Sequence, residues 1–295
     1  MRASERGFLL LYSHLGDQNR GVLSTFQLRM LAQRVSSWQR PKENRELSRD
    51  DLVRLGYGRE MAERILKLLS EEDRLEQYLR KGNSQGCVPI TRAGEAYPLI
   101  LRQRLGLDNP GCLWAKGDPA ILDTPAISLV GSRELREENR AFAEAVGYRA
   151  AMEGLTLVSG NARGADRTAQ EACLKAGGRV ISVVADELTR HPEKRNLLYL
   201  SEDGFDEPFT KARALSRNRC IHALGRMVFV AQSDLHRGGT WDGTVKNLRF
   251  GWSPVACFRD GSPAAAELEQ MGAYLIGTEE VKDLAGLGEL EIKMF

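Results

Sequence analysis

The sequence predicts an α/β protein in which a doubly wound, mostly parallel sheet follows a small helical N-terminal domain. From about residue 126 to residue 285, short apolar runs bounded by glycine, proline or polar residues alternate with helical patterns. Such runs, most of them β-branched, are typical of parallel strands that helices cover on both faces. The chain has 295 residues, of which 42% are apolar, so it can bury an ample core in one large or two smaller domains.

The N-terminal domain, predicted over residues 1–82, is helical because its apolar residues recur at helical spacing. Ser48 is a predicted helix N-cap with Asp51 three residues on, and the glycine pair in residues 56–58 ends that helix. Two short helices around a glycine turn can hold a DNA backbone through amide groups. They are also common as a plain helical hairpin, and both interpretations stay open here.

The following segment, residues 83–125, contains five prolines and many glycines. This composition predicts an irregular connection into the core, with one short strand around residues 112–117. The α/β domain then occupies residues 126–295. Its predicted strands are residues 126–130, 155–159, 179–184, 226–231 and 254–258.

Glycine-rich turns follow the first two strands of this domain. Ligands of such sheets bind at the carboxyl ends of the strands, near helix N-termini. There, Gly131 and Gly160 let backbone amides approach a ligand, and Arg133 and Arg163 can pair with phosphate. Asp166 lies near a helix start, where the helix dipole favours a carboxylate. These turns, with Ser132 and Ser159, predict a phosphate-binding site at one sheet edge.

A basic stretch, residues 208–226, contains no acid. Arg213 and Arg217 are four residues apart, so on one helix their charges would repel each other. A solvated helix face is the ordinary explanation of a charge run. An acid-free stretch of this length in an otherwise balanced domain instead predicts contact with nucleic acid or a nucleotide. Its five basic residues are Lys211, Arg213, Arg217, Arg219 and Arg226.

Several classes of protein are disfavoured by what the sequence lacks. The five cysteines have no C-x-x-C spacing and the four histidines no ligand spacing, so we expect reduced thiols and no metal site. The dinucleotide fingerprint and the P-loop pattern are both missing, which argues against nicotinamide, flavin and ATP cofactors. We find no nucleophile–base signature, signal peptide or membrane-length apolar run. A cytoplasmic protein without a cofactor or a membrane partner is therefore expected, and its catalytic signals are weak.

Three stretches in fixed order, "AISLVGSRE", "LVSGNARGADRTAQ" and "LSRNRCIHALGRMVFVAQ", resemble the DNA-processing protein A (DprA/Smf) family. The upstream "GEAYPLILRQRLGLDNPGCLWAKGDPAIL" is similar to that family's entry to its core. The resemblance implies an extended Rossmann-like core, single-stranded DNA binding, homodimerisation, and loading of the RecA recombinase during natural transformation. Because the family is not known for enzymatic activity, the resemblance also implies that this protein is not an enzyme.

Carried over by position, the resemblance assigns DNA or phosphate binding to Gly131, Ser132, Arg133, Ser159, Gly160, Arg163, Gly164, Arg217, Asn218 and Arg219. Lys211 is added from the basic stretch, and Asp166 becomes a residue that orders its loop rather than a catalyst.

The chain departs from the family pattern at three places near this site. Thr168-Ala169-Gln170 stands where the family usually has Ala-Ala-His, Gln232 where it has an acid, and residues 237–241 replace its Ser-Gly-Ser turn. No C-terminal winged-helix pattern is evident. The chain is therefore expected to be a divergent member, and service to a mobile-element or phage-defence locus fits that divergence.

Two alternatives stay open on the sequence alone. The same strand-end site could bind a nucleotide-derived ligand, as a sensor or as a phosphoribohydrolase with Asp234 and Asp242 as candidate acids. The third interpretation is an interaction scaffold with a vestigial pocket.

Overall fold

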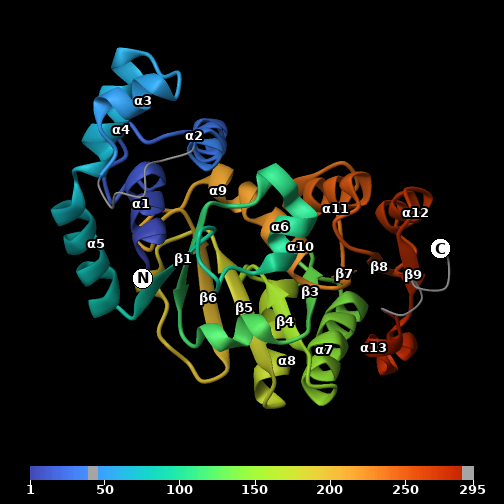
Figure 1. The fold of residues 1–295 in the computed structure, drawn as a ribbon. Coiled ribbons are helices and arrows are strands. Elements are labelled where there is room, and N and C mark those ends of the chain that lie inside the picture. Colours follow the sequence, from blue (N-terminus) through green and yellow to red (C-terminus); the bar gives the residue numbers. More distant parts are fainter. Residues whose placement is uncertain (39–45, 288–295) are drawn as a thin grey trace.

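The computed structural model describes residues 1–38 and 46–287, and one nine-stranded sheet runs through it (Figure 1). The strand order is β1-β2-β6-β5-β4-β3-β7-β8-β9. The strands are β1 (Cys87–Thr91), β2 (Cys112–Lys116), β3 (Ala126–Val130), β4 (Thr156–Ser159), β5 (Arg179–Val184), β6 (Leu197–Glu202), β7 (Val228–Val230), β8 (Val255–Phe258) and β9 (Tyr274–Ile276).

Seven of these strands, β3 to β9, are parallel, while β1 and β2 form an antiparallel extension beyond β6. The chain builds β3 to β6 in one direction and then returns to lay β7 on the other side of β3. Ser128 of β3 accordingly pairs with Val158 on one side and Val228 on the other. The point of reversal, between β3 and β7, is where open α/β sheets bind ligands at the strands' carboxyl ends. The predicted doubly wound, mostly parallel sheet is confirmed.

Helices cover both faces of the sheet (Figure 1). One face packs on α1, α5, α7 and α8, and the other on α6, α10, α11 and α12. The described helices are α1 (Ala3–Tyr12), α2 (Thr25–Ser37), α3 (Arg49–Arg54), α4 (Arg59–Leu69), α5 (Glu72–Ser84), α6 (Leu99–Leu105), α7 (Glu137–Met152), α8 (Ala165–Lys175), α9 (Lys211–Ser216), α10 (Asn218–Leu224), α11 (Gly238–Phe250), α12 (Pro263–Gln270) and α13 (Leu284–Leu287), with short 3₁₀ turns η1 (Gly106–Asp108), η2 (Pro119–Asp123), η3 (Leu188–Arg190) and η4 (Thr278–Lys282).

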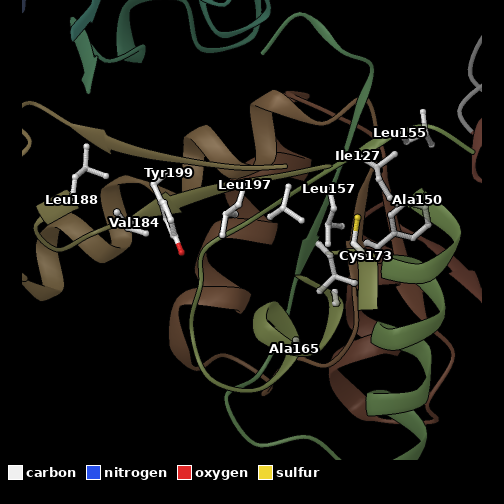
Figure 2. Close-up of a cluster of buried hydrophobic side chains, with 14 of the residues drawn as sticks. Ile127, Ala150, Leu155, Leu157, Ala165, Cys173, Val184, Leu188, Leu197 and Tyr199 are labelled. Carbon is white, nitrogen blue, oxygen red and sulfur yellow. The ribbon is translucent and has the colours of Figure 1, made fainter. Parts of the chain in front are cut away.

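The core on the first face is drawn in Figure 2, where Ile127 and Leu157 of the strands lie with Ala150 of α7 and Cys173 of α8. Helices α7 and α8 pack closely because Gly147 has no side chain. A Cβ there would fall 2.1 Å from the carbonyl oxygen of Ala169. This close packing holds α8 against α7, and the start of α8 carries part of the candidate site.

The N-terminal helices form a cluster of their own and also pack on the sheet. The predicted N-cap is confirmed: Ser48 Oγ accepts the Asp51 amide at 3.2 Å, and Asp51 accepts the Ser48 amide in return. Leu52 and Ile65 lie in the helical cluster, whereas α1 and α5 bury residues such as Leu9 and Leu75 in the core that includes the sheet. The division of the chain at residue 82 remains a prediction.

The sequence did not reveal three of the strands. Segment 83–125 was expected to be irregular with one strand, but it contributes β1, β2 and α6. Pro89 disfavoured the prediction of a strand here, because proline has no amide to donate to a sheet. It is tolerated in β1 because β1 is an edge strand. Strand β6 was missed because it includes polar residues although all of it is buried, and β9 was missed because it is only three residues long.

Two further findings concern the described residues as a set. All five cysteines are buried and free. None of the helices in residues 1–38 and 46–287 combines the length and the apolar character needed to cross a bilayer.

Candidate nucleic-acid interface

A cleft of about 660 Å³ opens at the point where the strand order reverses. Loops from the carboxyl ends of β3, β4 and β7 form three of its walls, and the segment from residue 209 to residue 218 forms the fourth. We call this the switch-point cleft. Its lining residues are Val130, Gly131, Ser132, Arg133, Glu134, Ala162, Arg163, Asp166, Phe209, Lys211, Ala214, Leu215, Arg217, Asn218, Ser233, Asp234, Arg237, Gly238, Gly239 and Thr240.

The loop after β3 is held in place by Gln232, which lies two residues beyond the end of β7. The Gln232 backbone carbonyl accepts the Ser132 amide at 2.9 Å, and its side-chain oxygen accepts the Arg136 amide at 3.0 Å. Its side-chain nitrogen donates to the carbonyl of Glu134 at 3.0 Å. A carboxylate could not make this last bond, because it has no proton to donate. Gln232 thus holds the Gly131-Ser132-Arg133 turn in place.

The loop after β4 is ordered by Asp166. Its Oδ2 accepts the amides of Gly160 and Ala162 at 3.1 and 3.2 Å. Burial raises the pKa of the Asp166 carboxyl, while Arg217 and the two amides act in the opposite direction. Gly164 has a φ of +86°, and a Cβ there would fall 2.4 Å from the Ser132 carbonyl oxygen. The two glycine-rich turns therefore interlock, and Asp166 lies where a loop-ordering role requires it.

Arg217 joins the basic segment to the loop after β4. Its Nη2 donates to the carbonyl oxygen of Gly160 at 3.1 Å. Burial lowers the pKa of the Arg217 guanidinium, opposed by the negative charges of Asp166 and Glu202. An arginine stays protonated despite such a shift, so Arg217 brings a positive charge to the base of the cleft.

Three exposed cations line the cleft and have no side-chain hydrogen bond or ion pair among the described residues: Arg133, Lys211 and Arg237. A fourth, Arg163, pairs with Glu134 at 3.1 Å, but both side chains are largely exposed. Exposed pairs of this kind contribute little stability, so Arg163 can exchange its partner for a phosphate at small cost. Exposed cations and two amide-rich turns thus line the same cleft.

Three predicted residues, Ser159, Gly160 and Gly164, shape the cleft but do not line it. Ser159 is buried and its hydroxyl accepts the side-chain amide of Gln170 at 2.7 Å. Gly160 and Gly164 allow the close approaches described above. Asn218 lines the cleft, and its side-chain nitrogen donates to the Gly239 carbonyl at 3.1 Å.

Two arginines of the basic stretch are directed elsewhere. Arg219 pairs with the buried Glu202 at 3.1 Å and donates to the Asp108 carbonyl, so it lies outside the cleft. Arg213 donates to the Ala185 carbonyl and to the Ser201 hydroxyl at the ends of β5 and β6. Both hold α9 and α10 against the sheet.

Several cleft residues were not among the predicted site residues, and two of them, Phe209 and Arg237, bear on the proposals below. The sequence held a signal for each of them: Phe209 is the second residue of the acid-free stretch, and Arg237 precedes the Gly-Gly-Thr turn after β7.

Of the candidate acids, Asp234 lines the cleft, while Asp242 pairs with Lys246 on α11 at 2.9 Å. Within the described part of the chain, no three His, Cys, Asp or Glu side chains are grouped to hold a metal ion.

Comparison with known proteins identifies the family. The profile described as DNA recombination-mediator protein A matches residues 89–284, which is more than half of the chain. The chain belongs to this family. Among curated relatives, DNA processing protein DprA of Streptococcus pneumoniae is 31% identical over 57% of this chain, and that of Bacillus subtilis is 30% identical over 70%. The aligned regions span 64% and 74% of those relatives' own lengths.

Solved structures of the family share the fold. The structure of Streptococcus pneumoniae DprA covers all of both chains with a TM-score of 0.73 at 24% identity. A Helicobacter pylori DprA structure, described as showing a single-stranded DNA binding mode, covers 71% of this chain and 97% of its own, with a TM-score of 0.56 at 24% identity. These matches support the Rossmann-like α/β core that the resemblance implied.

Proposed function

We propose that this chain binds single-stranded DNA in the switch-point cleft, as a non-enzymatic DNA-processing protein of DNA uptake and recombination. One observation carries the proposal. Three exposed cations, Arg133, Lys211 and Arg237, form no side-chain hydrogen bond or ion pair among the described residues, and they line the same cleft as two amide-rich turns. Cations in a groove neutralise backbone phosphates irrespective of sequence. Membership of a recombination-mediator family and the printed description of the H. pylori relative support the same ligand.

The salt dependence of binding tests this proposal. Affinity for a fluorescein-labelled oligodeoxythymidine is measured by anisotropy between about 50 and 200 mM salt. We expect log Kd to rise linearly with log salt. Because single strands give a slope of about 0.7 per neutralised phosphate, alanine at Arg133, Lys211 and Arg237 together should lower the slope by about 2.

A matched variant controls for net charge. Lys175, Lys194 and Arg195 are also exposed and partnerless among the described residues, but they lie near the amino ends of the strands. Their triple alanine variant loses the same charge and should keep the wild-type slope. Equal slopes for the two triple variants would contradict the assignment of the cleft.

A nucleotide-derived ligand is the second candidate for this cleft, and a separate experiment tests it. The cleft volume of about 660 Å³ is within the range of small-molecule sites. A thermal-shift panel separates the two ligands, since a ligand of the native state raises the melting temperature. Stabilisation by a mononucleotide, with none by single-stranded DNA, would favour a sensor.

The family assignment also supports three finer proposals. We propose that the chain acts in the cytoplasm, forms a homodimer, and passes its DNA strand to RecA. Light scattering of the full chain tests the dimer. The rate of RecA-dependent ATP hydrolysis on single-stranded DNA, with and without this protein, tests the transfer.

A further inference from the structure

The side chain of Phe209 is exposed within the switch-point cleft. It is 56% exposed and lines the switch-point cleft, between Pro208 and the N-cap of α9. Thr210 is that N-cap, and its hydroxyl accepts the Arg213 amide at 3.0 Å. The ring position is therefore set by a capped helix rather than by burial.

A structural explanation for Phe209 would be a hydrophobic staple, in which the residue before an N-cap packs on the fourth residue of the helix. That residue is Ala214, whose methyl group is too small to cover a phenyl ring. The ring stays more than half exposed, so a staple does not account for it. Phe26 on α2 is more exposed still, so exposure alone does not indicate a ligand. What distinguishes Phe209 is its place in the switch-point cleft, beside exposed cations.

The surroundings of Phe209 indicate the chemistry of that ligand. The neighbouring Leu215 is 49% exposed in the same cleft, and Lys211 lies between the two in sequence. Arg133 and Arg237 line the same cleft. A ligand that matches this wall has a flat apolar face linked to a negative charge. An unpaired nucleotide in a strand has both, whereas the bases of a duplex are already stacked on each other.

We propose that Phe209 is a stacking platform for one unpaired base, while neighbouring phosphates are held by the exposed cations of the cleft. The inference rests on the proposed function and adds to it a site that contacts a base rather than the backbone. Stacking on an aromatic side chain is sequence-tolerant, because every base has a π face. The platform therefore distinguishes single strands from duplexes without reading sequence.

The test compares two oligonucleotides of equal length and phosphate number, one normal and one with abasic tetrahydrofuran units throughout. Phe209→Ala and Phe209→Leu should bind the normal strand about tenfold more weakly than wild type and the abasic strand equally well. Phe209→Trp should keep wild-type affinity for the normal strand. The salt slope should not change in any of them, since no phosphate contact is lost.

Phe26 provides the matched control, because it is 70% exposed on α2 and does not line the cleft. Phe26→Ala should bind both strands like wild type. If Phe209→Ala binds the normal strand as tightly as wild type, or loses affinity equally for both strands, the stacking assignment is overturned while the proposed function stands. If the wild-type protein binds neither strand, the proposed function fails and the platform fails with it.

Discussion

The guanidinium of Arg217 lies against the α-carbon of Gly160. Nη2 donates to the Gly160 carbonyl at 3.1 Å, and a Cβ at position 160 would fall 1.7 Å from Nη1. Glycine is therefore required here by the close approach of a charged side chain, since the backbone of Gly160 is not among those with positive φ. A side chain at position 160 would force the end of Arg217 to move away from the loop after β4.

Replacing Gly160 with alanine should therefore displace Arg217. We expect Gly160→Ala and Arg217→Ala each to weaken single-stranded DNA binding, and the double variant to be no weaker than the worse single one, because both remove the same arrangement. Anisotropy titration at fixed salt measures this. Gly7→Ala is the control, because a Cβ there meets no atom within 4 Å. Additive losses in the double variant would contradict the coupling.

Two acids of the cleft should have opposite effects on binding. Asp166→Ala removes the acceptor of two loop amides, so we expect a loss of about 1–3 kcal/mol in unfolding free energy and weaker DNA binding. Asp234→Ala removes an exposed negative charge from the same cleft, and should leave stability within about 0.5 kcal/mol while tightening binding. Urea unfolding and anisotropy test both variants. Tighter binding by Asp166→Ala would refute the loop-ordering role.

Replacing Arg219 should lower stability, whereas replacing Lys211 should weaken DNA binding. Arg219→Ala leaves the carboxylate of Glu202, which is 6% exposed, without its ion pair, so we expect a loss of about 2–4 kcal/mol. Lys211→Ala should change stability by less than about 0.5 kcal/mol but lower the salt slope of DNA binding by about 0.7. A slope change in Arg219→Ala, measured where the variant is folded, would instead place Arg219 on the DNA.

The buried His222 should make the fold sensitive to acid. Its side chain is fully buried, and burial lowers its pKa to about 3. The unfolded chain takes up the proton near pH 6.5, so stability is present above that pH and is lost as the pH falls from about 6.5 toward 3. The slope is about 1.4 kcal/mol per pH unit. His222→Leu should flatten the unfolding free energy over that window, and parallel pH profiles for the two proteins would contradict this.

The fold could be predicted where the chain alternates clearly between apolar strands and amphipathic helices. The positions of β3, β4, β5, β7 and β8 in the sequence followed from such runs, whereas their order in the sheet did not. Strand β6 was not predicted because its apolar run is short and ends in Ser201 and Glu202. These two polar residues are buried because Arg213 of α9 and Arg219 of α10 bond to them. Those partners are distant in sequence, so no local pattern could reveal them.

The candidate site shows the same limit at the level of side chains. Glycine turns at strand ends indicated where the cleft lies, because topology alone brings those ends together. Which arginines face it depends on helix phase. Arg217 and Arg219 are two residues apart, which is about 200° around a helix, so they point to opposite sides. Arg219 therefore reaches Glu202 while Arg217 reaches Gly160.

The brace formed by Gln232 has a thermodynamic consequence. Its three bonds to the loop after β3 hold the cleft wall in shape before any ligand arrives. The protein then gives up little conformational freedom on binding, and the entropy loss falls almost entirely on the flexible strand. Among unstacked strands of the same charge, affinity should accordingly be greater for stiffer ones, because they have less conformational entropy to lose on binding.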